Sequence, residues 1–204
     1  MLSPITQRLI KAFQSIPGIG PKSAQRIVFY LLSQASREKA STLADALQSA
    51  VKQVQKCERC WFYSEENLCQ LCSNAKRDST LLCVVESPAD VIAIEQTNIY
   101  SGLYFVLQGH LSPLDGLGPE EIGIPVLFKR LQEGVVKELI IATNPTMEGQ
   151  ATAHYITHHV DSQQIRCTRI AYGIPLGGEL EYLDSGTLRH AFHSRMPIPS
   201  ITER

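Results

Sequence analysis

The sequence has 204 residues, of which 44% are hydrophobic and 19% are charged, and this composition excludes an intrinsically disordered chain. No apolar run approaches the roughly 20 residues that a membrane-spanning helix needs, and residues 1–15 lack the apolar stretch of a secretory signal. We therefore expect a cytoplasmic protein with no membrane partner. The net charge of −1 hides an asymmetry, because residues 1–56 carry eight basic and two acidic side chains, or +6, and the remainder carries −7. Such a basic segment is expected to meet a polyanion.

Three amphipathic helices are predicted in this basic segment. Apolar residues recur at helical spacing over residues 5–16, and the sequence Pro-Gly-Ile-Gly at 17–20 ends the pattern. A proline next suits the first turn of a second helix, which we expect over residues 21–35. A third apolar stripe over residues 43–54 predicts a helix that reaches the first cysteine, Cys57.

The Gly-rich turn between the first two helices has the features of a phosphate-binding nest. Gly18 and Gly20 allow backbone angles that other residues resist, so amide groups of the turn and of the next helix can point outward together. The helix dipole, Lys22 and Arg26 would help to hold a phosphate there, with little dependence on base sequence. The alternative is a helical hairpin whose turn is only a connector. A nucleotide P-loop fits poorly, because the G-x4-G-K-[ST] spacing is absent and the turn follows a helix.

Four cysteines form two CxxC pairs, Cys57 with Cys60 and Cys69 with Cys72. Each pair can present two thiolates to a tetrahedral ion, and four thiolates leave no open position for water, so the pattern predicts a structural zinc ion. Disulfides and a redox motif are the alternatives, but a reducing cytosol disfavours disulfides and redox CxxC motifs usually come singly. The aromatic residues at 61–63 are expected to form the core of this small knuckle, although exposed rings could instead stack on single-stranded bases.

After the cysteines, short runs rich in β-branched and aromatic residues alternate with helical patterns. Strands are expected over residues 81–85, 103–107, 139–142 and 165–172, and helices over residues 89–96, 125–132 and 150–159. This alternation predicts an α/β fold with a mostly parallel sheet covered on both faces. Cys83 and Cys167 lie inside strands and are expected to be buried. A turn-rich link leads to a terminal helix expected over residues 185–194, with Ser185 as its N-cap.

Five motifs occur in a fixed order along nearly the whole chain. Residues 16–24 read Ile-Pro-Gly-Ile-Gly-Pro-Lys-Ser-Ala, which is similar to a helix-hairpin-helix motif, and the cysteine quartet follows it. The other three are Val-Glu-Ser-Pro-Ala-Asp at 85–90, Gly-His-Leu-Ser-Pro-Leu-Asp-Gly-Leu-Gly-Pro-Glu-Glu at 109–121 and Gly-Ile-Pro-Leu-Gly-Gly-Glu-Leu-Glu-Tyr at 173–182. In this order the motifs resemble the RecR family of bacterial recombination mediators.

The resemblance implies four parts and their ligands. These are a helix-hairpin-helix DNA-binding domain over residues 1–56, a four-cysteine zinc knuckle over 57–79, a Toprim domain over 80–172 and a C-terminal segment with an oligomer contact over 173–204. It implies one structural zinc ion per subunit, held by the four cysteines, and DNA contacts at Gly18, Gly20, Lys22 and Arg26. It also implies a homo-oligomer, commonly a tetrameric ring that encircles or clamps DNA.

The function that the resemblance implies is that of a non-enzymatic mediator of recombinational DNA repair. Such proteins act with RecO and RecF at gapped duplexes and at single-strand/double-strand junctions, where they promote the loading of RecA. One alternative is a metal-dependent Toprim phosphotransfer enzyme, a nuclease or a primase-like enzyme, that uses Glu86 and Glu148. Another is a protein scaffold that never touches DNA.

The residues of the Toprim segment bear on the choice between mediator and enzyme. Toprim enzymes hold magnesium with a Glu after the first strand and a D-x-D pair after a later one. Glu86 supplies the first, but the pair reads Asn144-Pro145-Thr146, so neutral groups replace two carboxylates that a hard cation requires. Asp90 and Glu148 would keep this pocket acidic. We expect a docking surface for a basic partner such as RecO; magnesium binding is left open, and no catalytic role is expected for it.

Overall fold

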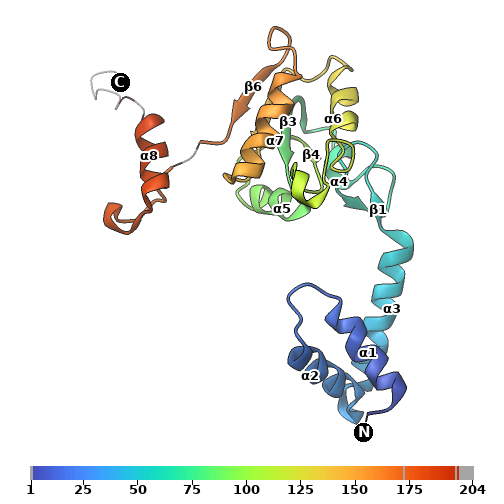
Figure 1. The fold of residues 1–204 in the computed structure, drawn as a ribbon. Coiled ribbons are helices and arrows are strands. Elements are labelled where there is room, and N and C mark those ends of the chain that lie inside the picture. Colours follow the sequence, from blue (N-terminus) through green and yellow to red (C-terminus); the bar gives the residue numbers. More distant parts are fainter. Residues whose placement is uncertain (1, 172, 196, 198–204) are drawn as a thin grey trace. The chain divides into compact units, whose positions relative to one another are not determined.

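The computed structural model describes residues 2–171, 173–195 and 197, and the chain divides into two compact units after Val54 (Figure 1). We call residues 2–54 the N-terminal unit and residues 55 onward the C-terminal unit. None of the helices in the described residues is long and apolar enough to cross a membrane.

The N-terminal unit consists of three helices and one 3-10 turn. Its elements are α1 (Pro4–Gln14), α2 (Pro21–Leu32), the 3-10 turn η1 (Gln34–Ser36) and α3 (Arg37–Gln53). Pro21 occupies the first turn of α2, as predicted. The predicted end of this helix is wrong, because Ser33 takes an extended conformation (ψ 147°) and η1 follows it. As a result α3 begins at Arg37, six residues before the predicted start.

The C-terminal unit is built on a four-stranded parallel sheet with the strand order β4-β3-β5-β6. Its strands are β3 (Asp78–Val85), β4 (Gly102–Val106), β5 (Glu138–Ala142) and β6 (Arg166–Arg169). Its main helices are α5 (Pro88–Gln96), α6 (Ile124–Leu131) and α7 (Met147–His158). The predicted parallel α/β sheet is therefore confirmed. The last strand is shorter than predicted, and Tyr172, at its predicted end, lies outside the described residues.

The sheet buries apolar side chains on both faces, because successive residues of a strand point in opposite directions. On one face Leu82 and Phe105 pack in a cluster with Leu127 of α6 and Ile156 of α7. On the other face lies a smaller cluster of Cys83, Val85, Val91, Tyr104 and Val106, which α5 and residues of the cysteine segment cover. Cys83 is buried as predicted, whereas Cys167 near the sheet edge is only half-buried.

The terminal helix α8 (Ser185–His193) begins where predicted, but its N-cap is Asp184 and not Ser185. The Asp184 carboxylate accepts hydrogen bonds from the amides of Gly186 and Thr187 at 2.9 and 3.0 Å. Hydrogen bonds from Thr187 and from these amides hold the pKa of Asp184 below its usual value. A carboxylate at this position also interacts well with the helix dipole, which explains why the aspartate takes the cap in preference to the neighbouring serine.

Candidate metal centre and nucleic-acid surface

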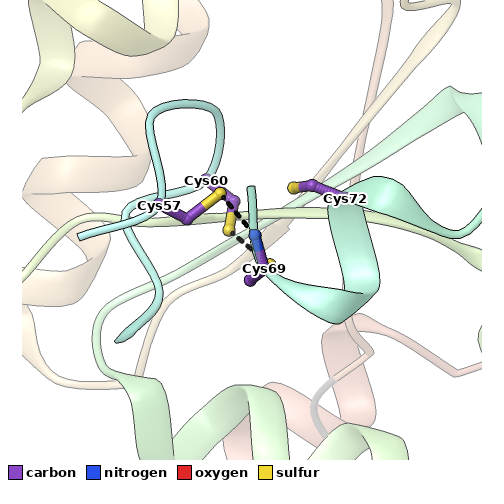
Figure 2. Close-up of side chains that lie close together, drawn as sticks. All are labelled: Cys57, Cys60, Cys69 and Cys72. Carbon is purple, nitrogen blue, oxygen red and sulfur yellow. Dashed lines mark hydrogen bonds between the residues drawn. The ribbon is translucent and has the colours of Figure 1, made fainter. Parts of the chain in front are cut away.

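Four cysteines gather at the start of the C-terminal unit, in a segment that we call the knuckle (residues 55–74). The short antiparallel strands β1 (Gln55–Lys56) and β2 (Tyr63–Ser64) flank the turn that carries Cys57 and Cys60. Cys69 is the N-cap of the short helix α4 (Gln70–Ser73), and Cys72 lies within that helix. Figure 2 shows the four side chains converging from these two places.

The geometry of the four sulfur atoms suits a tetrahedral zinc ion. All four atoms lie within 4.8 Å of one another, and every thiol is free. Sulfur atoms that are each about 2.3 Å from a zinc ion would lie about 3.8 Å apart, so only a small adjustment is needed. Backbone amides already point at two of the sulfurs, from Cys69 to Cys57 Sγ at 3.3 Å and from Phe62 to Cys60 Sγ at 3.5 Å. Donors of this kind orient the ligands of a metal site.

The thiols also perturb one another's ionisation in the way expected of a crowded metal site. Hydrogen bonds from Cys60 and Cys72 lower the pKa of Cys69 to about 2, and the contact with Cys69 raises the pKa of Cys60. The contact with Cys60 acts to lower the pKa of Cys72, but Cys69 and burial outweigh it and raise that pKa to about 12. Four neighbouring thiols cannot all ionise unless a cation offsets their repulsion. A structural zinc ion meets this need, and its four sulfur ligands leave no position for catalysis.

The knuckle is joined to the edge of the sheet by hydrogen bonds and by one aromatic ring. The Val106 amide donates to the Cys60 carbonyl at 2.8 Å, and Gln108 Nε2 donates to the Trp61 carbonyl at 2.9 Å. The Trp61 ring lies 5.9 Å from that of Phe105, so this residue packs on the sheet. Of the three aromatic residues expected to form the knuckle core, Phe62 packs against the cysteines as predicted. The prediction is wrong for Trp61, which packs on the sheet, and for Tyr63, which is 54% exposed.

A shallow depression of about 260 Å³ lies at the carboxyl ends of the strands. Its lining residues are Glu86, Ser87, Pro88, Gln108, Gly109 and Asn144. The Glu86 side chain is buried, and Asn144 serves both of its oxygens: the Asn144 amide donates to Oε1 at 2.8 Å and Nδ2 donates to Oε2 at 2.7 Å. His110 Nδ1 lies 3.5 Å from the same Oε2. Asn144, which stands at the first position of the D-x-D pair, therefore binds Glu86 directly.

The other candidate residues of this site have different contacts. Asp90 Oδ2 accepts hydrogen bonds from the amide and the hydroxyl of Ser87, both at 2.8 Å, and so closes the capping box of α5. Thr146 caps α7, because its hydroxyl accepts from the Gly149 amide at 3.0 Å. Glu148 is exposed in the first turn of α7. The depression is therefore less acidic than the sequence suggests, since Glu86 alone of the three predicted acids lines it.

In the N-terminal unit, the turn between α1 and α2 presents free amide groups and two cations. Gly18 has a left-handed backbone (φ 82°), and Gly20 is an N-cap with no side-chain hydrogen bond. The backbone amides of Gly20, Lys22 and Ser23 donate no hydrogen bond within the described residues. The side chains of Lys22 and Arg26 are exposed and lie one turn apart on α2. Free amides at a helix start, next to two cations, form a surface that suits a phosphate.

Two functional contacts of the C-terminal unit escape the sequence analysis. In the sequence, Asn144 stands out only because it replaces a carboxylate of the D-x-D pair. The residues around it do not indicate that its side-chain amide binds Glu86, 58 positions earlier. Arg130 looks like an ordinary surface cation in the last turn of a helix, yet it is buried beside the knuckle. Neither contact leaves a pattern in the sequence, because both join segments that are far apart along the chain.

Four family models match consecutive parts of the chain. They describe a RecR helix-hairpin-helix at residues 6–51, a RecR zinc finger domain with four cysteines at 54–74, a Toprim domain at 80–171 and a RecR C-terminal part at 173–196. The cysteine cluster lies inside the second match, and the four-stranded sheet lies largely inside the third. These matches support the structural zinc ion that the sulfur geometry indicates.

Curated relatives are similar over almost the whole chain. A recombination protein RecR from Coxiella burnetii is 65% identical over 198 residues, which are 97% of this chain and 98% of that protein. Proteins of the same name from Saccharophagus degradans and Hydrogenovibrio crunogenus are 54% and 52% identical, and each comparison covers 97% of this chain and the whole of the relative. With this identity, the four matched models and the four-cysteine centre, the chain belongs to the RecR family of recombination proteins.

Proposed function

We propose that this chain is a non-enzymatic, DNA-binding mediator of recombinational repair in the cytoplasm. It binds gapped duplexes and single-strand/double-strand junctions, acts with RecO and RecF, and promotes the loading of RecA. Membership of the family of recombination proteins supports the pathway. The single observation that carries the DNA-binding step is the set of free amides at the start of α2, next to Lys22 and Arg26.

DNA contact through the turn follows from the chemistry of its donors. Neither Gly18 nor Gly20 has a Cβ atom, and the positions where one would stand are open. A phosphate can therefore come close to the backbone amides of the turn. Lys22 and Arg26 add charge without reading bases. Binding of this kind depends little on sequence and strongly on salt, since each neutralised phosphate releases counterions.

The double variant Lys22→Ala/Arg26→Ala is expected to lose DNA affinity. At moderate salt the affinity for a fluorescent gapped duplex should fall about 10-fold or more, and the slope of log affinity against log salt should shrink by about 1 for each phosphate that is no longer neutralised. Fluorescence anisotropy over a salt series measures both quantities. The fold should be unchanged, because both side chains are exposed.

The matched control is Arg37→Ala/Lys52→Ala, which removes the same charge from exposed positions of α3. This control should retain most of the affinity. Equal reductions in the two double variants would show that only the net charge matters and that the turn does not bind DNA. Full affinity in Lys22→Ala/Arg26→Ala would remove the turn from the interface altogether.

We further propose that the chain works as a homo-oligomer, a tetrameric ring that surrounds DNA. The charge of +6 on residues 1–56 is modest for a DNA-binding protein, and a ring would multiply it around the duplex. A closed ring would also keep each weak contact at high effective concentration. Light scattering during the same DNA titration gives the mass of the species that binds.

The proposal excludes phosphoryl transfer at the Toprim depression. Both oxygens of Glu86 already accept hydrogen bonds from Asn144, and no carboxylate stands at position 144 or 146 to complete a magnesium site. We expect end-labelled gapped DNA to stay intact with the protein and Mg²⁺ or Mn²⁺. Cleavage or synthesis that disappears in Glu86→Ala would support the enzyme alternative. The exposed Glu148 in the first turn of α7 instead supports docking of a basic partner such as RecO on this face.

A further inference from the structure

Arg130 is an unusual residue in the core of the C-terminal unit. It lies in α6, whose neighbouring residues Leu127 and Leu131 pack in the main apolar cluster, and it is itself only 6% exposed. Burying a guanidinium costs free energy unless its donors and its charge are both compensated. The contacts of Arg130 show how the donors are satisfied.

One nitrogen of the guanidinium joins the knuckle to the sheet. Arg130 Nη1 donates to the carbonyl of Arg59 at 2.9 Å and to the carbonyl of Tyr104 at 2.8 Å. Arg59 lies inside the first CxxC pair, immediately before Cys60, and Tyr104 lies in β4. Arg130 therefore holds the backbone of the turn that must present two sulfurs to the zinc ion.

The charge of Arg130 has no carboxylate partner. Among the described residues it forms no ion pair, and the nearby Glu133 instead binds Arg59 at 3.0 Å on the surface. Burial lowers the pKa of Arg130; Cys72 favours its charged form, as do Cys60 and Glu133, whereas the neighbouring Arg59 disfavours it. A zinc ion with four thiolates keeps a net negative charge, so the centre itself can compensate the buried cation.

We propose that Arg130 is the outer-sphere partner of the zinc centre: it fixes the turn between Cys57 and Cys60 through the Arg59 carbonyl and offsets the negative charge of the zinc thiolates. It is a positioning residue and not a ligand. Outer-sphere residues of this kind change metal affinity although they never touch the metal. Arg130 would thus join the first CxxC turn to α6.

The test is a zinc competition experiment on the full chain, with a chromophoric chelator as the competitor. Arg130→Met keeps the length and apolar stem of the side chain but removes its charge and donors, and we expect zinc affinity to fall about 10-fold to 100-fold. Arg130→Lys keeps the charge but replaces the planar fork by a single ammonium, so a smaller, measurable loss of up to about 10-fold is expected. Circular dichroism at saturating zinc shows that the compared proteins are folded.

Two matched variants separate this role from general effects. Arg59→Gln removes a surface cation of the same turn and its ion pair with Glu133, but leaves the Arg59 carbonyl in place. Leu127→Ala weakens the packing of the same helix but leaves Arg130 and its hydrogen bond to the Arg59 carbonyl in place. Both should bind zinc like the unaltered protein. The proposal would be overturned if Leu127→Ala lost as much zinc affinity as Arg130→Met. It would also be overturned if Arg130→Lys and Arg130→Met both bound zinc normally. If Arg130→Met does not fold, the zinc affinity of Arg130→Lys decides.

Discussion

Cys60→Ser is expected to abolish tight zinc binding and to lower the stability of the C-terminal unit by several kcal/mol. A serine hydroxyl is a poor ligand in a site of soft thiolates, and a structural zinc ion contributes an apparent free energy of about 10–16 kcal/mol in small zinc domains, part of which this variant forfeits. Cys60 is fully buried at the centre of the knuckle, and its carbonyl also accepts the Val106 amide. Elemental analysis of the purified variant and thermal unfolding with and without added zinc measure the two effects.

The consequence should extend beyond the knuckle. Trp61 follows Cys60 directly, and its ring packs on Phe105 while its carbonyl accepts from Gln108. If zinc no longer holds Cys60, these contacts to the sheet lose their anchor, so hydrogen exchange should rise in β4 as well as in the cysteine turns. The N-terminal unit has its own buried residues and should keep its protection.

The control for this variant is Cys167→Ser, which alters a half-buried cysteine far from the knuckle in sequence. It should bind one equivalent of zinc and unfold within a few degrees of the unaltered protein. A Cys60→Ser protein that retained stoichiometric zinc, or that lost zinc with no change in its unfolding temperature, would contradict the structural role. A chelator that strips the metal from the unaltered chain should reproduce the effect of the substitution.

The parts of the fold that the sequence predicts are those with a local cause. The CxxC pairs lie close along the chain, so their spacing alone identifies the metal and its four ligands. The strands are apolar on both faces because helices cover both, and the alternation with helical patterns gives a parallel sheet. Pro21 begins α2 because its missing amide hydrogen would have had no partner.

The parts that the sequence does not predict depend on competition or on distant contacts. Asp184 and Ser185 are both good N-caps; the apolar pattern does not choose between them, and the charge of the aspartate favours it at the helix start. The residues after Leu32 have no strong helix breaker, and the turn at Ser33 forms for reasons that the apolar pattern does not contain. Trp61 packs on the sheet from a left-handed backbone (φ 62°), a conformation that a tryptophan in the sequence does not indicate.

The contact between Glu86 and Asn144 leads to the second large prediction. Asn144→Asp is expected to destabilise the C-terminal unit by about 1–3 kcal/mol, because it removes a charge-assisted hydrogen bond and sets a second carboxylate against the buried Glu86. The replaced donor, Asn144 Nδ2, lies 2.7 Å from Glu86 Oε2; Glu86 is 5% exposed, whereas Asn144 is exposed, so water screens the repulsion from one side only. Urea unfolding monitored by fluorescence of the single tryptophan, Trp61, measures the loss.

Divalent cations should discriminate between repulsion and simple loss of the bond. A hard cation that enters between two carboxylates relieves their repulsion, so millimolar Mg²⁺ should recover part of the stability of Asn144→Asp and should leave the unaltered protein unchanged. Asn144→Ala loses the donor but gains no charge; it should be destabilised less and should not respond to Mg²⁺. Equal stability of the aspartate variant and the unaltered chain would mean that the amide is not the partner of Glu86. Recovery by Mg²⁺ without strand cleavage would show that one restored carboxylate is enough to attract the metal. The chemistry of a Toprim enzyme also needs the second carboxylate of the D-x-D pair. In this chain Thr146 occupies that second position and caps α7.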